Sequence, residues 1–185
     1  MKPEINIFLI SDNHFNHWNI NKYCNRGFNS LAEMNTTMIK KWNNIVRQKD
    51  IVIIVGDLVF TKGDSNEIKN IIKVLNGRKI LVKGNHDRKS NLFYLTNGID
   101  FICEKFEWNF NNKKILFIHN PHLIDPIEFV KYKYIIHGHQ HNAVPFIQKK
   151  QKCICVNVST EHINYTPLNL ITLLNKLKQG YHESY

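Results

Sequence analysis

Long hydrophobic runs are absent from this 185-residue sequence, and no stretch approaches the ~20 apolar residues that a membrane helix needs. The apolar run near the N-terminus is also too short for the core of a secretory leader. Internal repeats, low-complexity segments and linkers are likewise missing. These absences favour one cytoplasmic domain that spans residues 1–185 and has no membrane partner.

Cysteine is scarce, with four residues in the chain. Without a secretory leader, so few cysteines are more typical of reduced thiols than of a disulfide framework. Cys153 and Cys155 would project to one face of a strand, where both can pack as small apolar residues. No second cysteine pair completes a thiolate metal site, so we expect these two to be structural.

Negative charge is in the minority, because 15 acidic residues face 25 Lys and Arg and leave a formal net charge of +10. A positive field attracts anions such as phosphates. The lysines are nevertheless spread along the whole chain, whereas a nucleic-acid track clusters them with aromatic residues. The nearest approach to a cluster is the segment 149–152. Polymeric nucleic acid therefore stays an open partner.

What the sequence does contain is a set of five short apolar runs that each lead into Asp, Asn or His. The runs are Ile5–Ile10, Ile51–Val55, Lys79–Val82, Ile115–Ile118 and Tyr134–Ile136. Their length and their β-branched content predict buried strands. Ligands gather at the carboxyl ends of the strands in α/β sheets. We therefore expect Asp, Asn and His side chains to meet at one place, and together these residue types make a metal site.

The spacing of apolar residues predicts helices over 30–46 and 64–75, with Ser30 and Asp64 as N-caps. Helices that alternate with strands predict a parallel sheet in the first half of the chain. The second half is richer in strands and predicts a more antiparallel meander. Its expected elements are the strands Phe101–Phe110, Lys113–Ile118, Tyr134–His137, Val144–Gln148 and Cys153–Val158, a hairpin turn at Asn111-Asn112, and either a helix or a strand followed by a helix over Pro167–Leu177.

Short spacings at the ends of the predicted strands favour chelation. Asp12-x-His14 and His139-x-His141 each place two side chains on one side of an extended backbone. Gly84 permits a tight departure from its strand before the segment 85–87. Each pattern alone is common by chance, and a Gly-Asp pair is an ordinary turn. Their occurrence in this order is hard to attribute to packing.

The ordered series Asp12-x-His14, Gly56-Asp57, Gly84-Asn85-His86-Asp87, His119 and Gly138-His139-x-His141 resembles the signature of the calcineurin-like metallophosphoesterase superfamily. The resemblance runs from about Ile5 to Ser159. It extends to small single-domain bacterial and phage members through the segments 11–17 and 24–26, although Gly27 stands where those members often have proline. The fold it implies is an α/β protein, a four-layer α/β/β/α sandwich of two mixed β-sheets with a dinuclear metal site at the strand ends.

The resemblance also implies roles for individual residues. One metal ion would be held by Asp12, His14, Asp57 and His141, and the other by Asp57, Asn85, His119 and His139. Mixed oxygen and nitrogen ligands suit two divalent ions, with Mn²⁺ expected and Fe, Zn²⁺ or Ni²⁺ as alternatives. His86 would donate a proton to the leaving oxygen, and Asp87 would orient it.

The activity implied is hydrolysis of phosphoester bonds through in-line attack of a metal-bridging hydroxide. A small nucleotide-like ester is the expected substrate of this phosphodiesterase or phosphatase, with Asn85, His17, Trp18 and Arg26 as substrate contacts. As an equally favoured alternative to substrate contact, the aromatic rings of the loop 15–28 only pack this loop against the rest of the domain. The alternatives are a nuclease acting on polymeric nucleic acid and a non-catalytic scaffold for protein binding. The residues leave the oligomeric state open.

Overall fold

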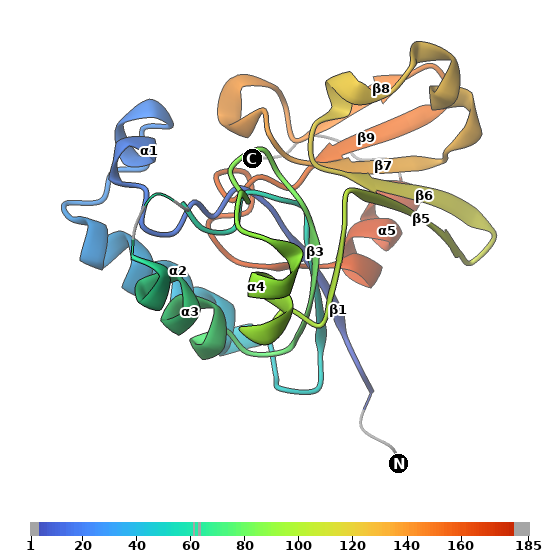
Figure 1. Ribbon diagram of the computed structural model, residues 1–185. Coiled ribbons are helices and arrows are strands. Elements are labelled where there is room, and N and C mark those ends of the chain that lie inside the picture. The colour runs from blue at the N-terminus through green and yellow to red at the C-terminus, as the bar shows by residue number, and fades with distance from the viewer. Residues whose placement is uncertain (1–3, 61, 63, 180–185) are drawn as a thin grey trace.

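Two five-stranded sheets lie face to face in the computed structural model, which describes residues 4–60, 62 and 64–179 (Figure 1). The ends of the expected domain, residues 1–3 and 180–185, lie outside the described residues. The first sheet contains, in spatial order, β10 (Leu168–Asn169), β1 (Ile7–Ile10), β2 (Ile51–Ile54), β3 (Arg78–Val82) and β4 (Phe101–Cys103). Strands β1 to β4 are parallel and β10 is antiparallel to β1, so the sheet is mixed as expected.

Three helices cover the outer face of the first sheet: α2 (Leu31–Ile45), α3 (Ser65–Val74) and α4 (Asn91–Thr96) (Figure 1). The predicted caps are confirmed, because the Ser30 side chain accepts a hydrogen bond from the Glu33 N–H and the Asp64 side chain accepts one from the Asn66 N–H. Helix α2 buries one apolar stripe, formed by Met34, Met38 and Trp42. Among the described residues, no helix has the length and apolar character needed to cross a membrane.

The second sheet is also mixed. Its spatial order is β5 (Lys105–Phe110), β6 (Lys113–Ile118), β7 (Tyr134–His137), β9 (Cys153–Asn157) and β8 (Ile147–Lys150). The pairs at its two edges are antiparallel, whereas β7 runs parallel to both β6 and β9. The turn between β5 and β6 is the predicted one, since Asn111 and Asn112 have φ values of +49° and +58°, as a primed hairpin turn requires.

One core lies between the sheets, where Leu9, Ile53 and Val82 of the first sheet belong to one cluster with Phe117 and Ile136 of the second. Helix α5 (Leu170–Lys178) adds four buried leucines to this cluster. The outer face of the second sheet is covered by 3₁₀ helices, η1 (Pro121–Leu123) and η2 (Pro126–Lys131), where the sandwich was expected to carry α-helix. Cys153 and Cys155 are buried on this face as free thiols, as predicted.

The antiparallel meander predicted for the second half is wrong in the centre of the sheet. Residues 119–133 separate β6 from β7, and residues 138–152, which include β8, separate β7 from β9. Both separations are long enough for the crossovers that parallel strands need. The predicted strand 101–110 divides at Glu104, because the chain leaves the first sheet there and enters the second. Strand β8 begins at Ile147 instead of Val144, and the C-terminal segment follows the strand-then-helix alternative.

Candidate metal centre

The carboxyl ends of β1, β2, β3, β6 and β7 meet at one edge of the sandwich, and the structure brings the side chains that follow them together. The seven residues expected there are Asp12 and His14 after β1, Asp57 after β2, Asn85 after β3, His119 after β6, and His139 and His141 after β7. Contacts between side chains connect all seven, in the order His141, Asp12, His14, Asp57, His119, Asn85, His139.

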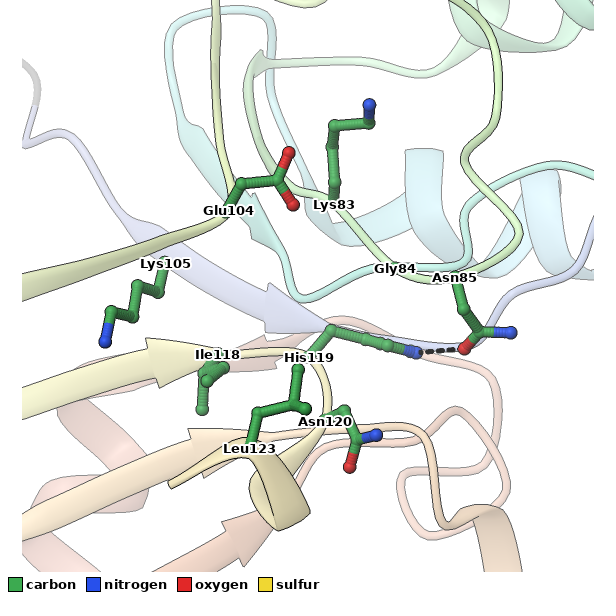
Figure 2. A pocket seen from close by; sticks show the side chains of 9 residues that line it. All are labelled: Lys83, Gly84, Asn85, Glu104, Lys105, Ile118, His119, Asn120 and Leu123. Atoms are coloured by element: carbon green, nitrogen blue, oxygen red, sulfur yellow. Dashed lines mark hydrogen bonds between the residues drawn. The ribbon is translucent and has the colours of Figure 1, made fainter. Parts of the chain in front are cut away.

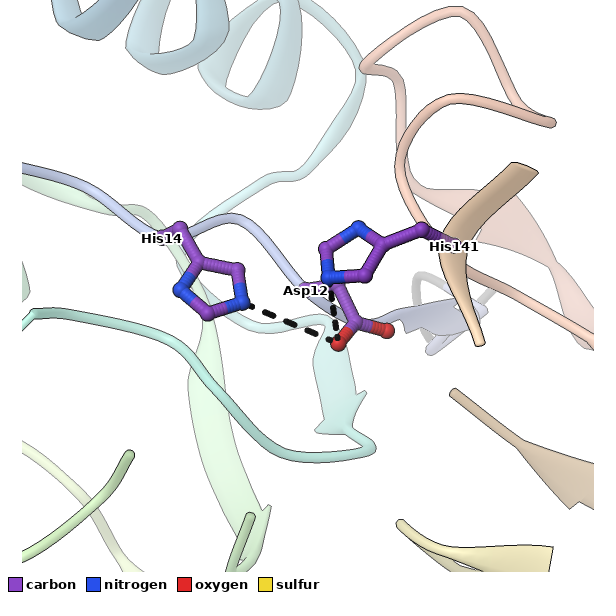
Figure 3. Close-up of side chains that lie close together, drawn as sticks. All are labelled: Asp12, His14 and His141. Carbon is purple, nitrogen blue, oxygen red and sulfur yellow. Dashed lines mark ion pairs between the residues drawn. The ribbon is translucent and has the colours of Figure 1, made fainter. Parts of the chain in front are cut away.

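A first group consists of Asp12, His14 and His141 (Figure 3). Oδ1 of Asp12 lies 3.9 Å from Nε2 of His14 and 3.7 Å from Nε2 of His141. Oδ1 of Asp12 and Nε2 of His14 are buried without a hydrogen-bond partner among the described residues. Burying polar atoms without a partner is costly, and atoms that bond one cation at about 2.0–2.2 Å lie roughly 3–4 Å apart. The group therefore fits a divalent cation.

A second group lies on the other side of Asp57. Nε2 of His119 is 3.4 Å from Oδ2 of Asp57 and 3.2 Å from Oδ1 of Asn85, and Nδ1 of His139 is 3.0 Å from the same Asn85 oxygen. Nδ1 of His119 lies 2.8 Å from the Val55 carbonyl oxygen, to which it donates in the tautomer that leaves Nε2 free for a cation. Asp12, Asp57 and His119 bring oxygen and imidazole nitrogen atoms within ligand separations, and His139 joins them through the Asn85 oxygen.

Asp57 stands between the two groups. Its Oδ2 atom is 3.4 Å from Nε2 of His14 and 3.4 Å from Nε2 of His119, so one oxygen faces a histidine of each group. Burial lowers the pKa of His14 to about 3, which leaves its imidazole neutral. Burial also acts to lower the pKa of His119, but the hydrogen bond that its ring donates to Asp57 and the charges of Asp12 and Asp57 outweigh this effect and raise that pKa to about 9. A cation beside Asp57 would take the place of the His119 proton.

The backbone at the candidate ligands is strained. Five of the seven have φ in the left-handed region: Asp12 (57°), His14 (50°), Asp57 (53°), His139 (71°) and His141 (45°). This region is sparsely populated by residues other than glycine, although Asp and His enter it more readily than most. Such strain persists only where the surrounding structure imposes it, and it clusters at functional sites.

Three glycines give the candidate ligands their space. A Cβ atom at Gly56 would overlap the His119 ring, and one at Gly84 would overlap the Asp57 carboxylate. A Cβ atom at Gly138 would overlap the side chains of Ser11 and Asp12. The sequence indicated a backbone role for Gly84, and the structure adds this steric one.

Comparison with known proteins decides the family. A family model for the calcineurin-like phosphoesterase superfamily domain matches residues 5–163. The chain belongs to this superfamily. Membership and the clustered carboxylates and imidazoles support phosphoester hydrolysis as the class of reaction and a metal-dependent centre as its means.

Relatives of this superfamily member include an uncharacterised protein of Methanocaldococcus jannaschii, 41% identical over 178 residues that cover 94% of this chain and 92% of the relative. A crystal structure of a protein of unknown function from Aquifex aeolicus has a TM-score of 0.73 and 26% identity, covering 94% of this chain and all of that one. The phosphoesterase YfcE of E. coli has a TM-score of 0.45 and 13% identity over 83% of this chain and 78% of its own.

The phosphoesterase centre has a supporting residue that the sequence interpretation missed. Oε1 of Glu161 lies 3.1 Å from Nδ1 of His141, which leaves Nε2 of that ring directed at Asp12. A carboxylate on the far nitrogen fixes the tautomer of a metal-binding histidine. Glu161 follows β9 just as the candidate ligands follow their strands, so its position was the signal that could have found it.

Arg26 differs from its expected role as a substrate contact. Its side chain is 0% exposed, and it donates to Oε1 of Glu161 at 2.6 and 2.9 Å. It also donates to the backbone carbonyl oxygens of Asp12 and Asn13, at 2.7 and 2.8 Å. The guanidinium thus faces the interior and holds the loop of the first candidate ligands, a place that gives a substrate no access to it.

Asp87 also differs from its expected role, because its carboxylate does not orient the His86 ring. Its two oxygens accept hydrogen bonds from the backbone N–H groups of Asp57, Leu58 and Gly84, at 2.7 to 3.1 Å. Burial, together with the charge of Asp57, raises the pKa of Asp87 to about 7. Asp87 therefore joins the loops that follow β2 and β3 and fixes the backbone of Asp57.

Two rings lie beside the first group. The His86 ring centroid is 5.0 Å from that of His14, and the His86 N–H donates to Oδ1 of Asp57 at 2.8 Å. The His17 ring stacks on Phe60 at 4.1 Å and approaches Nδ1 of His14 at 3.3 Å, which favours support of that ligand. Trp18, 41% exposed, begins the short helix α1 (Trp18–Tyr23), which the sequence did not predict.

Proposed function

We propose that this chain is a dinuclear metal-dependent phosphodiesterase or phosphatase that hydrolyses a small nucleotide-like ester. The observation that carries the proposal is the position of Asp57, one oxygen of which faces His14 and His119 at equal distances. A shared carboxylate between two groups of ligands is how a protein holds two ions close together. The unpartnered Oδ1 of Asp12 and Nε2 of His14 support the same assignment.

In this proposal Asp12, His14, Asp57 and His141 hold one ion, and Asp57, Asn85, His119 and His139 hold the other, with Mn²⁺ preferred over Fe, Zn²⁺ or Ni²⁺. The ions supply positive charge that binds the phosphoryl oxygens and lowers the pKa of water toward neutrality. Asn85 lies at the edge of the second group, where its amide N–H₂ can donate to a phosphoryl oxygen.

His86 is the proposed proton donor to the leaving oxygen. Its ring lies beside His14 at the edge of the first group. Its backbone N–H donates a hydrogen bond to Oδ1 of Asp57, which fixes the position of residue 86 relative to the centre. A general acid of this kind contributes about 10²–10⁴ in rate, most for esters with poor leaving groups. Trp18, half-exposed beyond His17, is the ring that we propose stacks on a base.

The test is hydrolysis by the Mn²⁺-reconstituted protein of p-nitrophenyl phosphate, bis-p-nitrophenyl phosphate, cyclic nucleotides and single-stranded DNA. Asp57→Asn keeps the shape of the side chain but removes its charge, and Asp125→Asn, which retains the cap of η2, is the matched control. We expect the wild type and Asp125→Asn to hydrolyse the small diesters and Asp57→Asn to lose the activity. Preferential cleavage of the DNA would support the nuclease alternative, and no hydrolysis of any ester would support a scaffold.

A further inference from the structure

A cavity of about 390 Å³ opens beside the second group of candidate ligands (Figure 2). Asn85 and His119 form its wall toward the metal centre, and the hydrogen bond between them lies at its edge. This volume falls in the range of about 300–1,000 Å³ that is usual for small-molecule sites. A group attached to a phosphorus atom at the centre can therefore extend into the cavity.

Three charged residues line the cavity. Lys83 and Lys105 line it together with one acidic residue, Glu104. The ion pairs found in the described part of the chain include none to any of these three residues. Lys83 is held at its backbone, where its N–H donates to the Cys103 carbonyl oxygen at 2.8 Å. Two lysines against one glutamate leave a positive rim that attracts a phosphate.

The remaining walls offer polar and apolar contacts. Oδ1 of Asn120 accepts the His122 N–H at 3.0 Å, which directs the N–H₂ of that amide away from the cap. Leu123, 75% exposed, and Ile118 give the cavity an apolar side. An amide beside an apolar wall matches a sugar or a base as well as a phosphate. Because Arg26 is buried on the other side of the centre, this cavity is a better place for the rest of the substrate than the neighbourhood of Arg26.

We infer that the cavity is a subsite for a second phosphate, one ester unit away from the scissile phosphorus. The class of substrate is then a phosphodiester that carries an additional phosphomonoester, as in a nucleoside 3′-phosphate 5′-diester. Lys83 and Lys105, whose ammonium groups point apart in Figure 2, supply the positive charge that attracts the additional phosphate, and Leu123 contacts the group that joins the two phosphates. This inference rests on the proposed function, since it places the scissile phosphorus at the metal centre.

The test compares two chromogenic esters, thymidine 5′-(p-nitrophenyl phosphate) with and without a 3′-phosphate. The double variant Lys83→Met/Lys105→Met removes both charges and keeps most of the side-chain length, and Lys73→Met on the exposed side of α3 is the control. We expect the 3′-phosphate to raise kcat/KM about tenfold in the wild type and in Lys73→Met, and to lose this effect in the double variant. Hydrolysis of bis-p-nitrophenyl phosphate should change less than twofold.

Equal rates on the two esters in the wild type, or a retained effect in the double variant, would overturn the inference. Failure of the proposed function is distinguishable, because bis-p-nitrophenyl phosphate would then not be hydrolysed at all. Binding supplies an independent result: thymidine 3′,5′-bisphosphate should shift the amide NMR signals of Asn120 and Leu123 in the metal-free wild type, with an affinity at least fivefold weaker in the double variant. The same shifts with fructose 1,6-bisphosphate would support the phosphate subsite and indicate that its ligands are sugar phosphates. No shifts with either compound would contradict the phosphate subsite.

Discussion

Removing the carboxylate of Glu161 is predicted to weaken both the fold and the metal centre. This side chain is 7% exposed and contacts two partners through one oxygen, the guanidinium of Arg26 and Nδ1 of His141. Glu161→Ala leaves the fully buried Arg26 charge without its carboxylate, a change that costs about 3–5 kcal/mol in other proteins. It also frees the His141 ring, and loss of such a support lowers metal affinity about 10–100-fold.

Two measurements separate these effects. Urea unfolding of the metal-free protein reports the stability, and isothermal titration with Mn²⁺ reports the affinity. Glu161→Gln keeps an oxygen that accepts the Nδ1–H bond, so it should recover much of the affinity but little of the stability. Arg26→Met in the Glu161→Ala background removes the unpaired charge and should restore part of the stability. Glu128→Gln in η2, where the partly exposed carboxylate pairs with Lys131, is the control. Affinity for Mn²⁺ within twofold of the wild type in Glu161→Ala would refute the reasoning.

Three further predictions concern other parts of the structure. His86→Ala should keep its bound metal and lose about 10²–10⁴ in turnover on esters with poor leaving groups, and less on p-nitrophenyl esters; equal losses on both would argue for phosphate positioning instead. Hydrogen bonds from the Arg47 side chain hold the pKa of the buried Asp50 well below its usual value. Asp50 therefore stabilises the fold above pH ~4 and loses this contribution as the pH falls through its folded pKa. In urea unfolding, the wild type should be more stable than Asp50→Asn by about 1.5–3 kcal/mol at pH 7, and this difference should shrink below pH ~4. Gly138→Ala should displace the Asp12 side chain and lower Mn²⁺ affinity, and unchanged affinity would show that the loop absorbs the methyl group.

The sequence could predict where the candidate ligands gather because their signal is local. Each one lies within five positions of the end of a short apolar run, and parallel strands carry their carboxyl ends to the same edge. The strands and the main helices were predictable for the same reason, since burial on one face imposes a period that is visible in the sequence. The family resemblance implied a mixed second sheet, but the residue pattern alone did not show its parallel centre, because pairing between strands depends on the path of the connections.

The residues that support the centre were missed because their partners are distant in sequence. Arg26 and Glu161 are separated by 135 positions, and nothing local distinguishes a buried ion pair from two surface charges. Asp87 follows His86 directly, which suggested a pair, but its carboxylate turns to the backbone of the loop after β2. Side-chain direction of this kind is set by the tertiary structure.

The metal content of the reconstituted protein tests the central claim most directly. Elemental analysis after saturation with Mn²⁺ and removal of excess metal counts the ions per chain, and Asp57→Asn gives the comparison. Because Oδ2 of Asp57 faces a histidine of each group, we predict two ions per chain in the wild type and fewer in the variant. One ion or none in a wild-type protein that still hydrolyses bis-p-nitrophenyl phosphate would contradict the dinuclear account.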